Sequence, residues 1–460
     1  MVHQKAIYLI SSVAALAGLL FGFDTGVISG AILFINNDFQ LSHVQTEVVV
    51  SAVLFGAFFS ALMSGRLCDI HGRKKVIILT ALTFIVGTLV CAFTPNVNGL
   101  VLGRLILGLA IGIASYAAPL YLAEISPKKT RGFIVTLNQL AITVGILFSY
   151  LVDYAFSYQE AWRVMLFVGI VPALLLFVGM MYLPESPRYL LLKKKVEEAR
   201  QLLAKIRPAN EVEDELSAII HSQEAKSIRG RDLWMNKRFR AILLVGITLA
   251  ISQQVTGINT IIYYAPTIFQ RAGFHTTNAI LVTTMIGIVN VVSTLIALPL
   301  IDRIGRKTLL LVGVSGMCIS LVMMGYAFTQ HVLNDSLRYL LITSMMAYIA
   351  CFAFSLGPMV FVILSEIFPL AIRGRGMSLA MSGNWGANTL VALSFLSIIH
   401  QIGMTQTFYL FALMCVLTLC FIFYFIPETK GISLEQIERN IVDGVASRHL
   451  GQPGEAHVVE

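Results

Sequence analysis

Glu124-Ile125-Ser126-Pro127-Lys128-Lys129-Thr130-Arg131-Gly132 and Glu366-Ile367-Phe368-Pro369-Leu370-Ala371-Ile372-Arg373-Gly374 share the pattern E-I-x-P-x-x-x-R-G, about half a chain apart. Two more pairs keep nearly the same offset: Asp69-Ile70-His71-Gly72-Arg73-Lys74 with Asp302-Arg303-Ile304-Gly305-Arg306-Lys307, and Pro184-Glu185-Ser186 with Pro427-Glu428-Thr429. Three pairs at one offset indicate a duplicated unit of half the chain. Each copy is charged and stands at the end of an apolar run. The duplication therefore predicts a membrane bundle of two related halves, from which alternating-access carriers are built.

The composition excludes most soluble classes. Only 13% of the 460 residues are charged and 57% are AVILMFWYC residues, with a mean hydropathy of +0.80. Soluble proteins contain roughly 25% charged residues, so a membrane protein is predicted. The net charge of +8 is scattered over short loops, which does not favour nucleic acid as a partner. The six cysteines have no C-x-x-C spacing, and no cleavable signal is recognised.

Twelve apolar runs are long enough to span a bilayer, which requires about 20 residues each. The first six cover 6–35, 44–66, 75–94, 97–123, 132–155 and 162–183, and the last six cover 239–269, 278–301, 308–330, 337–364, 375–399 and 406–426. Helices are expected because an open strand leaves its backbone groups unpaired in lipid. The predicted fold class is an all-α membrane protein with twelve transmembrane helices in two six-helix halves. The expected domains are 1–183, a linker at 184–238, 239–430 and a tail at 431–460.

The linker and the loops predict the orientation. Residues 196–205 and 214–220 have helical composition, so short amphipathic helices are expected in the linker, with a plain solvated connector as the alternative. Lys and Arg gather in the loops 2–3, 4–5, 8–9 and 10–11. The positive-inside rule then places these loops, the linker and both termini in the cytoplasm. We expect a multi-pass cell membrane protein, in a bacterial inner membrane, that functions as a monomer.

The motifs resemble those of the sugar porters of the major facilitator superfamily, over nearly the whole chain. The resemblance is carried by Gly65-Arg66-x-x-Asp69-x-x-Gly72-Arg73, Gly103-Arg104, Pro184-Glu185-Ser186-Pro187-Arg188, Gln253-Gln254-x-x-Gly257-Ile258-Asn259 and Pro427-Glu428-Thr429-Lys430-Gly431, together with the E-I-x-P-x-x-x-R-G pair. It implies the major facilitator fold and transport of a monosaccharide, a hexose or a pentose, by alternating access.

Charged residues at the cytoplasmic span ends favour a gate. Arg and Lys alone would set topology, but topology does not require their acidic partners. Bridges between neighbouring helices that form only in the closed state would bias the equilibrium between outward- and inward-facing states. The candidate gate residues are Arg66, Asp69, Arg73, Glu124, Arg131, Glu185, Arg188, Asp302, Arg306, Glu366, Arg373 and Glu428.

Amides inside the spans favour a neutral, hydroxyl-rich ligand. An amide both donates and accepts hydrogen bonds, as sugar hydroxyls do, and polar groups at this depth are expensive unless they face the bundle interior. Helix–helix contacts are the alternative role for any one of them. Gly257 permits a local break of span 7. The predicted substrate residues, several of them implied by the resemblance, are Phe21, Gln139, Gln253, Gln254, Asn259, Tyr264, Asn290, Phe361, Asn384, Trp385 and Asn388.

Phe361 departs from the family pattern, which often has Trp at this position. Phe cannot donate a hydrogen bond and leaves more room. The identity of the sugar therefore stays open, and a cyclitol such as inositol is an alternative to a hexose or a pentose.

Asp24 is the predicted proton-coupling carboxylate and Arg104 its partner. A carboxylate inside an apolar span is a functional-site hypothesis by default, and the guanidinium stays charged as a fixed reference. A static ion pair between spans 1 and 4 is the alternative. The resemblance favours coupling, because proton-coupled sugar porters have Asp here and glucose facilitators have Asn.

Three other functions are weighed against proton-coupled symport: a facilitative uniporter, an inositol or polyol symporter, and a non-transporting sugar sensor. The tail after Gly431 is short for a signalling domain. An enzyme is not expected, because the sequence has no H-E-x-x-H, P-loop or G-x-S-x-G motif. No cofactor and no metal site are expected. The expected partners are the sugar, the proton and the lipid bilayer.

Overall fold

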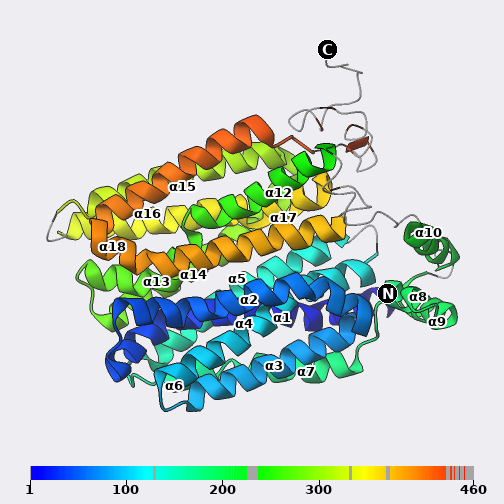
Figure 1. Cartoon of the computed structure of the whole chain (residues 1–460), viewed down its shortest axis with the longest axis horizontal. Helices are drawn as coiled ribbons and strands as arrows, with labels where there is room; N and C mark the ends of the chain where they lie inside the picture. Colours follow the sequence, from blue (N-terminus) through cyan, green and yellow to red (C-terminus); the bar gives the residue numbers. More distant parts are fainter. Residues whose placement is uncertain are drawn as a thin grey trace.

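The computed structural model describes residues 2–127, 131–208, 210, 212–224, 237–330, 334–368, 373–430, 432, 436–437, 440, 445 and 450. Within these residues the regular structure is helical, without a strand. Eleven of the described helices are long and apolar enough to cross a membrane. The helices run side by side along the long axis of the molecule (Figure 1), so the predicted helical membrane bundle is confirmed.

The first half contains six spans. They are α1 (Val2–Phe39), α2 (His43–His71), α3 (Arg73–Phe93), α4 (Val97–Ile125), α5 (Arg131–Ser157) and a sixth span in two pieces, α6 (Trp162–Phe167) and α7 (Ile170–Tyr182). The predicted spans agree with these helices to within about two residues, except that α1 extends further at both ends and α2 extends further at its C-terminal end.

The second half repeats the pattern with more breaks. It contains α12 (Lys237–Val255), α13 (Ile258–Arg271), α14 (Thr276–Ile304), α15 (Arg306–Ala327), α16 (Asp335–Phe354), α17 (Leu356–Ile367) and α18 (Arg373–Phe425). Span 7 is α12 plus α13 and span 10 is α16 plus α17. The eleven helices therefore correspond to twelve spans once α18 is divided.

The 53 residues of α18 make two spans rather than one. At about 1.5 Å per residue a straight helix of this length would be far longer than a bilayer is thick. Gly403 has φ 86° and ψ 168°, outside the helical region. The chain reverses there, at the end of the bundle (Figure 1), as the two separate predicted spans require.

The break in span 10 differs from the single helix that the sequence predicts. α16 ends at Phe354, and Ser355 has φ −119° and ψ −99° before α17 begins. Pro358 in the first turn of α17 has no N–H to donate to the carbonyl of Phe354, and its ring clashes with that carbonyl in a continuous helix. The proline therefore separates α16 from α17.

A stripe of glycines brings α1 and α5 into close contact. Gly18, Gly22, Gly26 and Gly30 follow one another at four-residue spacing on α1. A Cβ atom on Gly22 would lie 1.9 Å from the carbonyl oxygen of Ile142 on α5. Small residues at this spacing let membrane helices approach closely and gain van der Waals contact. The stripe therefore fixes α1 rigidly against α5.

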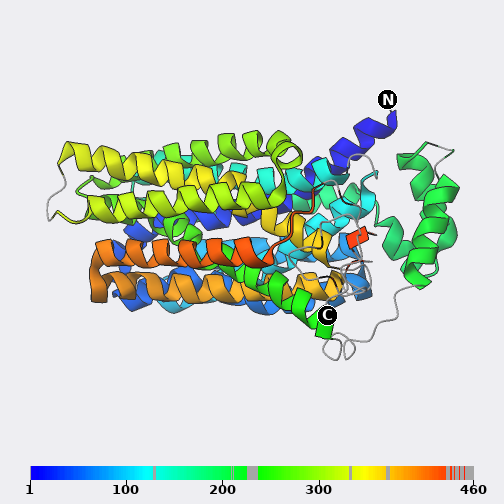
Figure 2. The same cartoon turned by 90° about the horizontal axis from the view of Figure 1, so that it is seen from above.

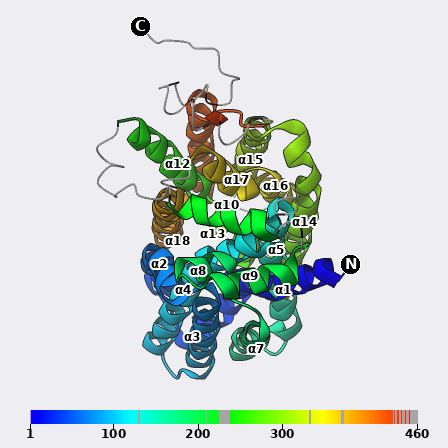
Figure 3. The same cartoon turned by 90° about the vertical axis from the view of Figure 1, so that its right-hand side faces the viewer.

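In the part of the linker that the structure describes there are three short helices, α8 (Pro187–Leu192), α9 (Val196–Ile206) and α10 (Val212–Glu224). They lie across one end of the bundle (Figures 2 and 3), which we call the linker end, and the opposite end is called the far end. Arg207 attaches them to the bundle: its Nη1 donates to the carbonyl of Ile125 at 3.0 Å and its Nε pairs with Glu215 at 2.6 Å. The expected short linker helices are present, and they are docked rather than merely solvated.

Candidate functional site

The break in span 7 organises a cluster of buried amides. Gly257 has φ 91° and ends α12, so the break that the sequence predicts is confirmed. The residues on each side face the second half of the bundle. Gln253 Nε2 donates to the carbonyl of Leu356 at 2.7 Å, and Asn384 Nδ2 donates to Gln253 Oε1 at 2.8 Å. Gln253 thereby satisfies a carbonyl at the start of α17, beside the break in span 10.

The amide chain continues through Gln254. Its Nε2 donates to Asn384 Oδ1 at 3.1 Å, and its Oε1 accepts from Asn259 Nδ2 at 2.7 Å. Three elements, α12, α13 and α18, therefore meet at one polar cluster. Gln254 and Asn384 are buried and Asn259 is half-buried. Gln253 and Gln254 are both buried in the bundle interior, whereas the sequence left open whether one or both of them face inward.

Polar atoms without a protein partner gather beside this cluster. Trp385 Nε1 and Asn388 Oδ1, which follow Asn384 on α18, are buried and form no hydrogen bond. Trp385 lies against Phe21, with ring centroids 5.3 Å apart. Buried polar groups in proteins are nearly always paired, so unpaired ones call for an explanation. An indole donor and an amide acceptor next to aromatic faces are suited to a small polar ligand.

The remaining predicted substrate residues lie on α5, α13, α14 and α17 and differ in their exposure to solvent. Tyr264 is fully buried, stacks on Phe395 at 5.2 Å and donates from its hydroxyl to the carbonyl of Ala392 at 3.5 Å. Asn290 on α14 is buried and Gln139 on α5 is half-buried. Phe361 on α17 is 36% exposed.

Asp24 and Arg104 form a buried ion pair in the first half. Arg104 Nη1 lies 2.7 Å from Asp24 Oδ1, and the side chains are 0% and 3% exposed. The guanidinium also donates to the carbonyls of Val49 and Val50 on α2 at 3.4 and 3.5 Å. Asp24 Oδ2 has no partner. The predicted pair is therefore formed across α1, α2 and α4, and the carboxylate keeps one free oxygen.

Two other carboxylates inside the spans are absent from the sequence-based candidates. Asp153 on α5 is fully buried and accepts from the Gly30 N–H at 3.1 Å. Glu47 on α2 is 2% exposed and contacts Ser397 on α18. The sequence feature that could have identified both residues is the one that identifies Asp24, an acidic residue within an apolar run. They stand closer to the span ends, where charge is common.

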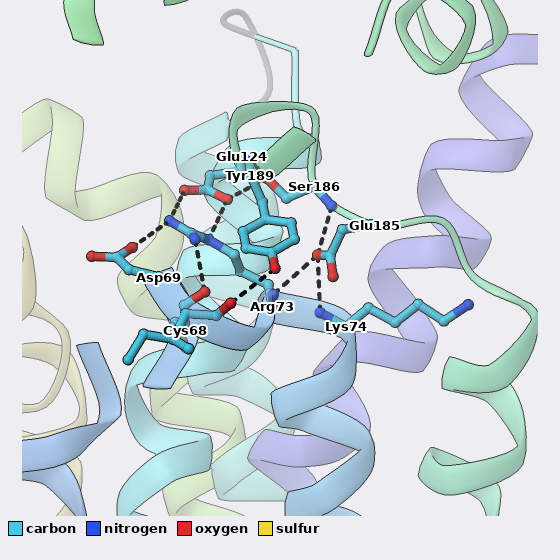
Figure 4. Close-up of polar contacts among 9 residues, drawn as sticks. Cys68, Asp69, Arg73, Lys74, Glu124, Glu185, Ser186 and Tyr189 are labelled. Atoms are coloured by element: carbon cyan, nitrogen blue, oxygen red, sulfur yellow. Dashed lines mark hydrogen bonds and ion pairs between the residues drawn. The ribbon is translucent and has the colours of Figure 1, made fainter. Parts of the chain in front are cut away.

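At the linker end of the first half, Arg73 is the centre of a charged network (Figure 4). Its guanidinium pairs with Glu124 at 2.9 Å and with Asp69 at 3.3 Å. Ser186 Oγ donates a short hydrogen bond to Glu124 Oε2, the oxygen that also faces Arg73 Nε. Glu185 Oε1 accepts from the peptide N–H groups of Arg73 and of Lys74, both at 3.0 Å. Glu185 therefore caps the N-terminus of α3, where helix N–H groups lack partners.

The second half repeats the described part of this network, with Arg306, Glu366, Glu428 and Thr429 in the places of Arg73, Glu124, Glu185 and Ser186. Arg306 Nη2 pairs with Glu366 at 3.2 Å, and Thr429 Oγ1 donates to Glu366 at 2.5 Å. Glu428 accepts from the N–H groups of Arg306 and Lys307 at 3.0 and 3.1 Å, which caps α15. The repeated motifs of the sequence thus make the same contacts twice.

A positive φ at Gly72 and Gly305 makes the two caps possible. Their φ angles are 93° and 108°. A Cβ atom on Gly72 would lie 2.3 Å from Glu185 Oε2, and one on Gly305 would lie 2.6 Å from Glu428 Oε2. Only glycine accommodates both the angle and the approach of the carboxylate. Burial raises the pKa of Glu185. The hydrogen bonds that Glu185 accepts from three peptide N–H groups and the positive charge of Arg73 partly offset this increase in pKa.

The described ion pairs of the gate candidates lie within one half, not between the halves. Asp69, Glu124 and Arg73 belong to the first half, and Arg306 and Glu366 to the second. Arg66 is exposed and Arg188 is half-buried. The side chains of Arg131, Asp302 and Arg373 lie outside the described residues. Contacts across the halves at this end therefore stay a prediction.

We expect Glu185→Ala and Glu428→Ala each to destabilise the protein by about 1–2 kcal/mol, because each leaves helix N–H groups unpaired. The measurement is the midpoint of thermal unfolding in detergent. Glu198→Ala is the matched control, since Glu198 is exposed and its ion pair among the described residues is with Lys195. Equal midpoints for all three variants would show that the caps do not stabilise α3 and α15.

Two surface hollows are lined by residues other than those of the amide cluster. A groove of about 380 Å³ between α2, α12 and α18 is lined by apolar groups, among them Phe58, Ile251 and Leu390. A second hollow, of about 450 Å³, lies at the far end and contains Asp38, Trp162 and Arg163. The chemistry of its groups, rather than the size of these hollows, makes the amide cluster the candidate site.

Comparison with known proteins gives the class. Residues 10–441 match the family model described as sugar (and other) transporter. The chain is 42% identical over 451 residues to the galactose-proton symporter of Escherichia coli (strain K12), covering 98% of this chain and 97% of that one. It is 38% identical over 447 residues to the arabinose-proton symporter of the same strain, covering 96% and 95%.

A solved structure agrees with this match. The proton:xylose symporter XylE bound to 6-bromo-6-deoxy-D-glucose superposes with a TM-score of 0.83 at 32% identity, covering 95% of this chain and 99% of that one. The fold is therefore that of the major facilitator superfamily. The chain belongs to the sugar porter family of that superfamily.

Proposed function

We propose that this protein is a secondary active transporter that moves a monosaccharide, a hexose or a pentose, together with a proton by alternating access. The observation that carries the proposal is the buried Asp24–Arg104 pair in the same bundle as a cluster of neutral amides. The similar proteins named above as galactose-proton and arabinose-proton symporters support it. The cargo is uncharged, because the polar groups of the cluster are amides.

The sugar binds where the unpaired polar atoms gather. Trp385 Nε1 donates to a hydroxyl, and the carbonyl oxygen of Asn388 accepts from one. Gln254 and Asn259 exchange their mutual hydrogen bond for bonds to the sugar. The rings of Phe21 and Trp385 offer apolar faces to the C–H side of the sugar. Gln139, Asn290, Phe361 and Tyr264 complete the predicted wall of the site.

The proton binds at Asp24. Protonation neutralises the carboxylate and releases it from Arg104, which stays charged and keeps its contacts with the α2 carbonyls. The partner-free Oδ2 is the oxygen available to the proton. A carrier of this kind couples the two fluxes when its bundle changes state with both ligands bound or with neither, and not with only one of them bound.

The two capped networks serve as the cytoplasmic gate. Each is a rigid unit within its half, so the halves can move as bodies and the networks meet or part at the linker end. Arg131, Asp302 and Arg373 belong to this gate together with the residues of the two networks, as the repeat of the motif predicts.

The orientation follows from the basic residues. Arg73, Lys74, Arg306 and Lys307 all lie at the linker end, so this end faces the cytoplasm and the far end faces outward. The termini are cytoplasmic, in a bacterial inner membrane. The chain acts as a monomer, with domains at 1–183 and 239–430, the linker at 184–238 and the tail at 431–460.

Uptake of labelled sugars into proteoliposomes, with a panel of unlabelled competitors, tests the function. We expect saturable uptake of one hexose or pentose that rises when the outside is acidic. Equilibration without a response to the pH gradient would indicate a uniporter, and preference for inositol would indicate a polyol symporter. Binding without uptake would indicate the sensor.

We expect Phe361→Trp to change the selectivity between sugars. The larger ring fills space beside α17 and adds an indole donor, so uptake of the bulkier sugars should fall relative to the smaller ones by about threefold or more. Competition within the same panel measures the ratio. An equal effect on every sugar would place Phe361 in packing or gating instead.

A further inference from the structure

The contacts between the two halves gather toward the far end. Tyr150 on α5 donates from its hydroxyl to the carbonyl of Ile262 on α13 at 3.0 Å, and Thr284 on α14 donates to the carbonyl of Tyr150 at 3.3 Å. On the other side of the bundle, α2 meets α18. The halves therefore touch through polar groups on both sides of the far end, which is closed in this structure.

The contact between α2 and α18 is the most specific of these. Ser397 donates to Glu47 twice: its peptide N–H lies 2.7 Å from Oε1 and its hydroxyl lies 2.6 Å from Oε2. Glu47 is 2% exposed. A peptide N–H in a helix ordinarily donates to the carbonyl four residues earlier, and here it reaches a carboxylate of the other half. One side chain thus joins the halves by two hydrogen bonds.

The surroundings of Glu47 make this contact reversible rather than permanent. Among the described residues no Lys or Arg pairs with Glu47. The two hydrogen bonds from Ser397 therefore provide the stabilisation that a buried carboxylate requires. When α2 and α18 separate, the carboxylate of Glu47 becomes hydrated. Its hydrogen bonds with water then offset the two hydrogen bonds lost with Ser397. Breaking the contact therefore leaves no buried carboxylate without a partner.

At the outer edge of the same interface, a side chain of one half also lies against a side chain of the other half. His43 on α2 and His400 on α18 are exposed, with ring centroids 5.3 Å apart. His43 lies one helical turn from Glu47, and His400 lies one helical turn from Ser397. Both histidines are nearer the far end of the bundle than the residues of the contact. The interface between the halves thus runs from the buried carboxylate to the end of both helices.

We infer that Glu47 and Ser397 form a latch between the two halves, and that the far end opens only when this latch is released. The inference deepens the proposed function and rests on it only for the alternation of the two ends. The latch belongs to neither the amide cluster nor the Asp24 pair. Its loss should raise the population of far-end-open molecules without removing any predicted ligand of the sugar or the proton.

Spin labels at the far end measure the opening. Cysteines at Val44 and Ile402, which are 62% and 44% exposed, carry the labels in a protein whose six native cysteines are replaced. Double electron–electron resonance then gives the distribution of distances between α2 and α18. We expect Glu47→Gln, which turns one acceptor into a donor, and Ser397→Ala to enlarge the long-distance population about tenfold each. The double variant should add little more, because both changes break one contact.

Thr46→Val is the matched control. Thr46 is the neighbour of Glu47, is buried, and donates to Asn36 Oδ1 at 2.9 Å within the first half. Its loss should leave the distances unchanged. Native-like distances in both Glu47→Gln and Ser397→Ala would overturn the latch, as would an equal change in Thr46→Val. The measurement needs neither sugar nor pH gradient, so a shifted distribution in a protein that fails to transport would refute symport and keep the latch.

Discussion

Asp24→Asn is expected to abolish accumulation of sugar against its gradient while leaving sugar exchange intact. The substitution keeps the shape of the side chain and its oxygen toward Arg104, but the amide binds no proton at neutral pH. A pH difference of two units supports about a hundredfold accumulation at one proton per sugar, because each unit is worth about 1.4 kcal/mol. In the variant the ratio of inside to outside sugar should fall to about one.

Two assays in proteoliposomes separate coupling from binding. Uptake on an imposed pH gradient reports coupling, and counterflow exchange at equal pH reports movement of the sugar site. Asp38→Asn is the control on the same helix, because Asp38 lies near the far end and pairs with Arg163 at 3.1 Å. If Asp24→Asn still concentrates sugar, coupling resides elsewhere, with the buried carboxyl of Asp153 as the next residue to change. If exchange is lost as well, the pair is a static support of the fold.

Gln254→Ala and Asn259→Ala are expected to weaken sugar binding by 1–3 kcal/mol each, or about fivefold to more than a hundredfold in Kd. Each change removes a donor and an acceptor from the amide cluster, so sugar hydroxyls lose hydrogen-bond partners. Titration calorimetry on purified protein measures the affinity, and the unfolding midpoint shows whether the bundle persists.

Gln270→Ala is the control for these variants. Gln270 lies on α13 as Asn259 does, but its amide donates to Thr276 at 2.8 Å, near the far-end connection between α13 and α14. Gln253→Ala is expected to behave differently again, because Gln253 supports the carbonyl of Leu356 and should lower stability together with affinity. Unchanged affinity in folded Gln254→Ala and Asn259→Ala would show that the site is not at the span 7 break.

The repeats made much of this structure predictable. Arg73 and Arg306 occupy equivalent positions in the motif and make equivalent ion pairs with Glu124 and Glu366. The break at Gly257 was also visible, because a glycine among polar residues in a span permits a change of helix direction. Duplication constrains the contacts as well as the fold, since two copies of one motif must satisfy the same backbone groups.

Other features depended on three-dimensional packing. Adjacent residues on a helix point about 100° apart, so the sequence could not tell which of Gln253 and Gln254 faces the ligand; the break after them allows both to be buried. The start of α17 depended on Pro358, whose effect is local to the fold of span 10. Glu47 was overlooked because an acidic residue near a span end usually reaches water, and only the position of Ser397 reveals that it is buried between the halves.

The simultaneous measurement of sugar uptake and internal pH in proteoliposomes tests the central claim most directly. Native protein, given its sugar and no pH gradient, should acidify the lumen as the sugar enters, in proportion to the sugar transported, and Asp24→Asn should carry the sugar without acidification. In the converse experiment, an imposed pH gradient should drive the sugar against its concentration gradient. A protonophore, which collapses the pH gradient, should stop this accumulation. Sugar entry by the native protein with constant internal pH would contradict proton-coupled symport and leave a facilitative carrier.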